Sequence, residues 1–206
     1  MKHDLHPTDS SGDPDVPSLE GRRVMLVPFH RRHIAFLYSL ATDPAIGFRW
    51  RLRGGVPSIE SFEASLWQAV LCQLIIETKS NQQPVGHVVA YNPNHNSGHC
   101  AVAIIMDANP SYKSLGLDGL QVFLGHLFSV YSFRKIYFEV PSYNIGQFRS
   151  ALGRYLTVEA QLKEHDYFAG QYWDTYVLSL WRPGVRGPEN SPRVLLGTGM
   201  PPVWHG

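Results

Sequence analysis

The sequence predicts an α/β domain with one mixed, mostly antiparallel sheet and helices on both of its faces. Three observations predict it. Strand-like and helix-like segments alternate along the chain. Three strand-like segments follow one another in the middle without a helix between them, which favours antiparallel neighbours. A strand–helix–strand unit comes next, and a crossover helix of this kind joins parallel strands.

The first half of the predicted string holds one strand, two helices and three strands. Ile34, Leu37 and Leu40 recur at helical spacing in the first helix, and Ser58 is suited to cap the second. Turn-forming residues separate the three strands. In chain order the elements are the strand Arg23–Phe29, the helices His30–Ala41 and Ile59–Val70, and the strands Leu74–Thr78, Gly86–Tyr91 and Cys100–Met106.

The second half begins with a loop over residues 110–116 and a helix with an apolar stripe over Leu117–Tyr131. Ile136, Phe138 and Val140 then alternate with polar residues, as in a half-buried strand over Lys135–Val140. A short helix after Asn144 and two strands complete the domain. These strands are Leu156–Leu162 and Tyr172–Leu180.

Length and composition fit a single globular domain with tails. Of the 206 residues, 44% are hydrophobic, and the formal net charge of +1 argues against a nucleic-acid partner. We expect a disordered leader over 1–18, the domain over 19–182 and a Pro/Gly-rich tail over 183–206. No apolar run reaches the ~20 residues that span a bilayer, and we expect no membrane partner and a cytoplasmic protein.

The two cysteines, Cys72 and Cys100, each lie in an apolar stretch without metal-ligand spacing. We interpret them as small buried hydrophobic residues, and we expect no metal site.

Five pieces of sequence, in order, resemble the GNAT superfamily of acyl-CoA N-acyltransferases, in particular its ribosomal-protein N-terminal acetyltransferase-like branch. Leu19–Pro28 is similar to the opening "L-x-G-x-x-V-x-L-R-P", and Pro84–Val88 to "P-I-G-x-I". Asn144, Glu159 and the segment Gly170–Leu180 are similar to the closing "N…E-G…D-G-x-Y-x-D…L-S-L". The resemblance covers about Leu19 to Trp181.

The resemblance implies acetyl-CoA or another acyl-CoA as donor, with its pyrophosphate at the start of the central helix. There the family has R/Q-x-x-G-x-G/A, and this chain has Ser111, Ser114 and Gly116, with Lys113 as a source of positive charge. Ala151 replaces the tyrosine that many members use as general acid. The donor-binding residues implied are Ile105, Met106, Ser111, Lys113, Ser114, Leu115, Gly116, Leu117, Asn144, Gln147 and Phe148.

The implied reaction is direct attack of an amine on a thioester, which needs a general base and donors to the carbonyl oxygen. His99 and Asp107 are the first candidates for the base, with His87 and the outward-facing Glu139 as others. Arg49, Trp50 and Arg51, in a loop of interleaved aromatic and basic residues, and Tyr172 in the final hairpin are candidates for acceptor binding.

Three functions follow from this pattern. The first is an N-acyltransferase that acts on a primary amine of a small molecule or peptide. The second is an acyltransferase that takes its acyl group from an acyl carrier protein, for which the weakened phosphate loop is expected. The third is a catalytically inactive GNAT-fold binding or regulatory module. By analogy with similar proteins we also expect a homodimer.

Overall fold

The computed structural model describes residues 18–44, 46–47 and 54–184. Almost all of the predicted leader and tail therefore lies outside the described residues. The strands are β1 (Val24–Pro28), β2 (Val70–Thr78), β3 (Pro84–Asn94), β4 (His99–Met106), β5 (Lys135–Pro141), β6 (Thr157–Phe168) and β7 (Gln171–Trp181). The helices are η1 (Arg31–His33), α1 (Ile34–Thr42), α2 (Ile59–Ser65), η3 (Pro110–Tyr112), α3 (Lys113–Val130) and η4 (Ser142–Phe148).

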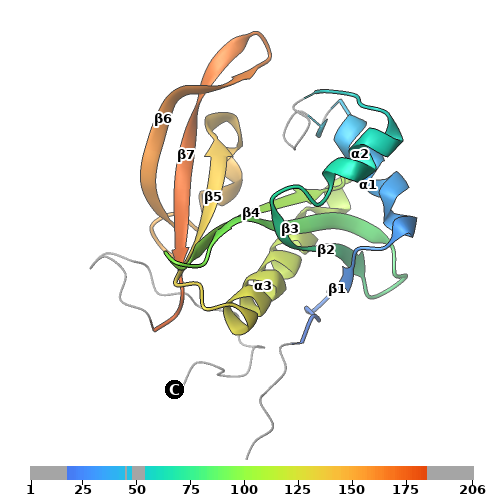
Figure 1. Cartoon of the computed structure of the whole chain (residues 1–206), viewed down its shortest axis with the longest axis horizontal. Helices are drawn as coiled ribbons and strands as arrows, with labels where there is room; N and C mark the ends of the chain where they lie inside the picture. Colours follow the sequence, from blue (N-terminus) through green and yellow to red (C-terminus); the bar gives the residue numbers. More distant parts are fainter. Residues whose placement is uncertain (1–17, 45, 48–53, 185–206) are drawn as a thin grey trace, which may run out of the picture.

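The strands form one seven-stranded sheet in the order β1-β2-β3-β4-β5-β7-β6. β4 and β5 pair in parallel, and the other adjacent pairs of the described sheet are antiparallel. Figure 1 shows α3 on one side of the sheet and α1 and α2 on the other. The predicted α/β class, with a mixed and mostly antiparallel sheet, is confirmed.

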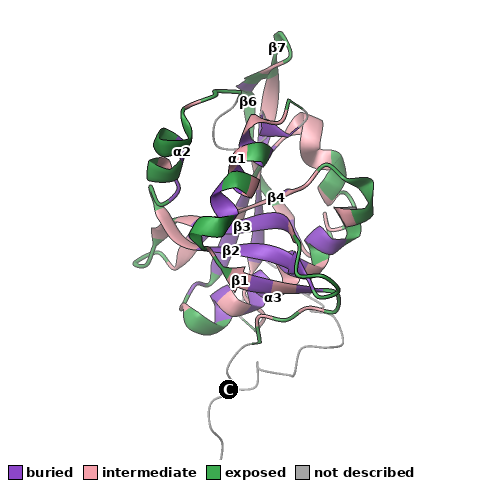
Figure 2. Cartoon of the chain, turned by 90° about the vertical axis from the view of Figure 1, so that its right-hand side faces the viewer, coloured by how far each residue is buried: buried purple, intermediate pink, exposed green. Residues whose placement is uncertain are grey.

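The two faces carry hydrophobic clusters of different size. Under α3, Phe123, Leu127 and Phe128 pack in the larger cluster with residues from strands β1 to β5 and β7. Phe62 and Leu37, from α2 and α1, form the smaller cluster on the opposite face. In Figure 2 the buried colour is concentrated on β2 and β3, between the two layers of helices. Such burial is the main source of the fold's stability.

Three predicted helix boundaries are wrong. The short helix expected after Asn144 is the 3-10 helix η4, which already begins at Ser142. The helix expected over Ile59–Val70 ends at Ser65, because Ala69 turns into the left-handed region at φ 56° and Val70 pairs with Tyr91 in the sheet. The loop expected over residues 110–116 is helical from Lys113. The side chains of Asp107 and Asn109 accept hydrogen bonds from the backbone two residues on, and so close the turns before the helix.

The cysteines lie on β2 and β4, with β3 between them, and both are free thiols. Cys100 is fully buried, and this burial, with Cys72 nearby, raises the pKa of its thiol to about 12. A thiol with so high a pKa stays protonated and behaves as a small hydrophobic group, as the sequence predicted. Of the helices in the described part of the chain, none has the length and apolar character to cross a membrane.

Candidate active site

The parallel strands β4 and β5 separate part-way along their length. Their pairing covers His99 with Lys135, Cys100 with Ile136 and Ala101 with Tyr137, and within the described residues it stops there. Both strands continue, to Met106 and Pro141. Figure 1 shows β5 diverging from β4 beyond this point, so that the sheet opens into two limbs. This opening puts unpaired strand backbone in the centre of the fold.

The backbone of β4 directs hydrogen-bond donors into the opening. The N–H of Asp107 donates to the carbonyl of Val85 on β3 at 2.9 Å. Successive N–H groups of a strand alternate between its two neighbours, so those of Ile104 and Met106 face the side from which β5 has departed. Donors fixed in this way can stabilise negative charge on an oxygen without reorganising.

On one face of the opening, the first turns of α3 lie close against the end of β4. A Cβ atom on Gly116 would be 3.0 Å from Cγ of Met106 and 3.2 Å from its Sδ. Gly116 is therefore a packing position inside the helix. Tyr112, the N-cap residue, makes no side-chain capping bond, and no acidic residue stands in the first turn. Asp107 and Asn109 already accept backbone N–H groups in the turns just before it, and the dipole of α3 favours an anion beside its first turn.

Asn144 lies within η4, the 3-10 helix that follows β5. Its side-chain oxygen Oδ1 is buried and has no hydrogen-bond partner among the described residues. A buried polar atom without a partner is costly, and native proteins usually keep one only where a ligand or water completes it. Nearby Phe148 packs against Phe138 of β5, with ring centroids 6.1 Å apart.

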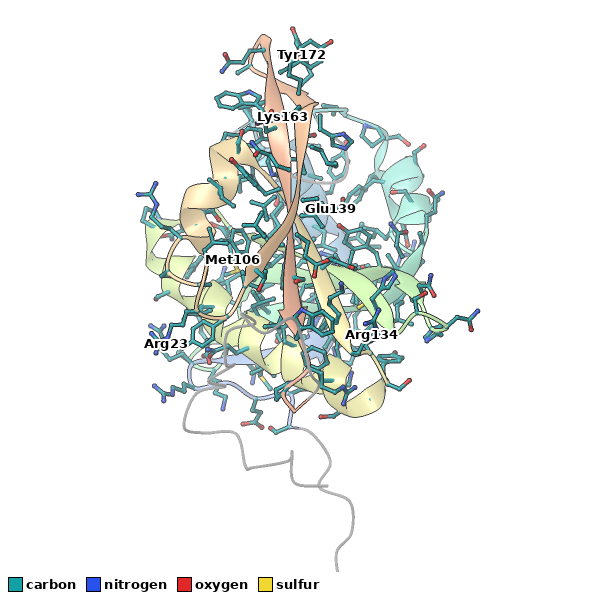
Figure 3. All side chains as sticks on the ribbon, turned by 90° about the vertical axis from the view of Figure 1, so that its left-hand side faces the viewer. Arg23, Met106, Arg134, Glu139, Lys163 and Tyr172 are labelled. Atoms are coloured by element: carbon teal, nitrogen blue, oxygen red, sulfur yellow. The ribbon has the colours of Figure 1, made fainter. Side chains whose placement is uncertain are left out.

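The opposite face of β5 presents Tyr137 and Glu139. Ile136, Phe138 and Val140 are buried in the cluster under α3, so the alternate residues point away from it. Tyr137 stands in the last pair of the β4–β5 ladder, and Glu139 is the next residue on its face, exposed and just beyond that pair. Figure 3 shows Met106 and Glu139 on opposite sides of the hairpin ribbon. The opening therefore has a face lined by α3 and a face that bears the Glu139 carboxylate, for which the described residues provide no ion pair.

No protein-family model and no curated protein sequence matches this chain. Solved structures do match. A spermidine N-acetyltransferase from Vibrio cholerae, solved with CoA and spermine, is 16% identical with a TM-score of 0.63, over 77% of this chain and 95% of that one. A GCN5-related N-acetyltransferase from Brucella melitensis is 19% identical with a TM-score of 0.63, over 82% and 80%. A GNAT-family acetyltransferase from Bacillus anthracis is 14% identical with a TM-score of 0.62, over 79% and 97%.

This chain has the GNAT fold. The likeness covers 80% to 97% of the length of these three proteins. The narrower resemblance to the ribosomal-protein branch of the GNAT superfamily stays a prediction.

Within the GNAT fold, the two residues predicted as bases lie at opposite ends of β4. His99 is the first residue of the strand and packs edge-on against Tyr137, with centroids 5.3 Å apart, where β4 and β5 are still paired. Asp107 follows the strand, and its Oδ1 accepts the N–H of Asn109 at 2.8 Å. Eight strand residues separate positions by about 26 Å, so the two cannot act on one reacting group.

His87, the third residue weighed as a base, is fully buried under α1 and α2. Its Nε2 lies 3.1 Å from Oε1 of Gln73. Glu139, which the sequence analysis ranked below His99 and Asp107, lies beside the opening.

The predicted donor-binding residues divide between the core and the surface. Leu115 and Ile105 are buried, Met106 and Phe148 are partly buried, and Ser111, Ser114, Leu117 and Gln147 are exposed. The side chain of Lys113 and the residues Arg49, Trp50 and Arg51 lie outside the described residues. Tyr172 is exposed near the tip of the β6–β7 hairpin and packs against Tyr167, with centroids 5.1 Å apart.

A half-buried ion pair links β5 to β6, in the part of the sheet formed by β5, β6 and β7. Lys135 Nζ donates to both carboxylate oxygens of Glu159, at 3.0 and 2.9 Å, and lies over the rings of Tyr137 and Trp181. Burial acts to raise the pKa of Glu159, but the Ser179 hydroxyl and the Lys135 ammonium outweigh it and lower that pKa. Burial likewise acts to lower the pKa of Lys135, and the Tyr137 and Glu159 side chains outweigh it and raise it.

Glu159→Gln is expected to lower the free energy of unfolding at pH 7 by about 2 kcal/mol, because it leaves a buried ammonium without its counter-charge. A carboxylate with a lowered pKa stabilises the fold above its ordinary value of 4.5, and this contribution is lost as the pH falls through the folded pKa. Urea unfolding at pH 7 and at about pH 3 should therefore show the difference between the proteins shrinking in acid. The exposed Glu164→Gln is the control; an equal loss in both variants would contradict the role of the pair.

Proposed function

We propose that this protein is an N-acyltransferase that moves an acetyl or other acyl group from a CoA thioester to a primary amine. The observation that carries the proposal is the opening between β4 and β5. Backbone donors of Ile104 and Met106 face into it, and Glu139 stands on the face away from α3. The likeness of fold to acetyltransferases supports the proposal, since one of them was solved with CoA and spermine.

The donor would enter from the face of α3. Its phosphates would lie near the first turn of that helix, which contains no acidic residue and where the dipole favours an anion. Its pantetheine arm would run between the limbs, where its amides can complete the buried Oδ1 of Asn144.

The acceptor amine would enter from the other face. The Glu139 carboxylate takes a proton from the ammonium group, directly or through water. The free amine then attacks the thioester carbonyl carbon, while the N–H groups of Ile104 and Met106 stabilise the charge on the oxygen. The new C–N bond forms and the C–S bond breaks. The second proton that the nitrogen loses passes through solvent to the leaving thiolate, and Glu139 later releases its proton to solvent. His99 and Asp107 stay as alternatives for the base.

The test is calorimetric titration with acetyl-CoA, followed by turnover assays with spermidine, spermine and a peptide with a free N-terminus. Binding and turnover are expected. An absence of binding to acetyl-CoA or longer acyl-CoAs would refute the CoA donor. Transfer only from an acylated carrier protein would then support the second function, and no transfer at all the binding module. A bulky substitution at the start of α3, such as Gly116→Trp, is not a suitable way to block the donor site. Met106 already lies 3.0 Å from the Cβ position, and the variant would disturb the packing of α3.

Asn144→Ala is a sharper probe of the donor site. It is expected to weaken acetyl-CoA binding about tenfold, because the pantetheine arm loses one hydrogen-bond partner in a buried position. The free energy of unfolding should stay the same or rise, since the buried oxygen has no partner among the described residues. Titration and urea unfolding of the same variant measure the two quantities. A loss of stability without a loss of affinity would make Asn144 a structural residue.

A further inference from the structure

Two arginines at the start of β1 lie against the first turns of α3, far from that helix in sequence. Nη2 of Arg23 donates to the carbonyl of Ser114, the second residue of α3, at 3.1 Å. The backbone N–H groups of Arg22 and Arg23 donate to the carboxylate of Asp118, at 3.0 and 2.8 Å. The close approach needs Gly21, whose Cβ would lie 2.6 Å from Asp118 Oδ1. The backbone thus fixes Arg23 beside the helix independently of its side chain.

The guanidinium of Arg23 is not part of an ion pair among the described residues, although the Asp118 carboxylate accepts its backbone N–H. Arg22 and Arg23 are both exposed, and neither guanidinium forms an ion pair with a carboxylate among the described residues. One nitrogen of the Arg23 guanidinium donates to the carbonyl of Ser114. The other N–H groups of the guanidinium have no hydrogen-bond partner within the described structure. A guanidinium held beside a first helical turn that contains no acidic residue is suited to bind a phosphate.

We propose that Arg23 binds a phosphate of the CoA donor. The inference rests on the proposed function. It explains how a donor site can work with Ser111 and Ser114 where the GNAT motif has a cation or glutamine and a glycine. A positive charge is then supplied from β1, outside the loop that carries it in the GNAT motif. In Figure 3, Arg23 lies on the same side of the molecule as Met106, and Arg134 lies on the other.

The experiment compares the affinities of wild-type protein and Arg23→Gln for CoA, 3′-dephospho-CoA and pantetheine, by calorimetry or by competition. Loss of a charge-assisted hydrogen bond should weaken CoA binding by about tenfold or more. Pantetheine, which has no phosphate, should bind both proteins equally. A tenfold loss that persists with 3′-dephospho-CoA assigns Arg23 to the diphosphate, and a loss that disappears assigns it to the 3′-phosphate.

Arg134→Gln is the matched control, since Arg134 is also an exposed arginine that donates to one backbone carbonyl, that of Ser97. It should leave the affinity for CoA unchanged. Arg23→Lys, which keeps the charge, should recover part of the affinity. Unchanged CoA affinity in Arg23→Gln, or an equal loss for CoA and pantetheine, would overturn the role of Arg23 while leaving the proposed function intact. Failure of the wild-type protein to bind CoA would overturn both.

Discussion

Glu139→Gln is expected to lower kcat by about 100-fold or more and to leave the affinity for acetyl-CoA unchanged. Glutamine keeps the size of the side chain but cannot take a proton from the acceptor ammonium, and general-base catalysis contributes factors of about 10² to 10⁴. Donor binding should persist because Glu139 lies on the face of β5 away from α3. The rate is followed by release of the CoA thiol, with whichever amine of the screen gives the highest turnover.

Two control variants, one at the first residue of β4 and one just after its last, make the result decisive. His99→Gln and Asp107→Asn are expected to change kcat by less than tenfold. His99 lies at the paired end of the strand, and Asp107 is engaged in the turn that precedes η3. If Glu139→Gln lowered kcat only slightly and one of the two controls lowered it strongly, the residue changed in that control would be the base. The acceptor side would then have to be sought at the corresponding end of β4.

Much of the fold could be predicted because its helices and strands follow local patterns of apolar residues along the chain. The apolar stripe that predicted a helix over Leu117–Tyr131 is the stripe that α3 buries, and the alternation around Phe138 is that of β5. The end of α2 could not be predicted in this way. Ala69 and Val70 fit a helical period, and only the pairing of Val70 with Tyr91 on β3 decides that the chain has already become a strand.

The site was less predictable, because its parts depend on contacts between distant segments. Asn144 and the start of α3 were found through motif resemblance. The donors of Ile104 and Met106 are backbone groups, which carry no residue signal, and their exposure depends on where β4 and β5 separate. Arg23 and Ser114 are 91 positions apart. Glu139 was recognised as facing outward, but its place beside the opening follows from the strand register alone.

Phe123→Ala is expected to destabilise the fold by about 4 kcal/mol, in the range for removal of a buried aromatic ring. Phe123 is fully buried in the middle of α3, in the larger of the two clusters. The same helix carries Val130, which is 53% exposed, and Val130→Ala should cost less than about 0.5 kcal/mol. Urea unfolding measures both. A cost below about 1 kcal/mol for Phe123→Ala would mean that α3 is not held against the sheet as described.

The same pair of variants separates folding from donor binding. α3 supplies both the largest part of the core and the helix start that would face the donor's phosphates. Neither Phe123 nor Val130 lies in its first turn. Acetyl-CoA binding by Phe123→Ala should therefore fall only with the folded fraction, and added acetyl-CoA should raise its stability through preferential binding to the folded state. A loss of affinity in protein that is still fully folded would instead show that the packing of α3 on β4 sets the geometry of the donor site, through the contact between Gly116 and Met106.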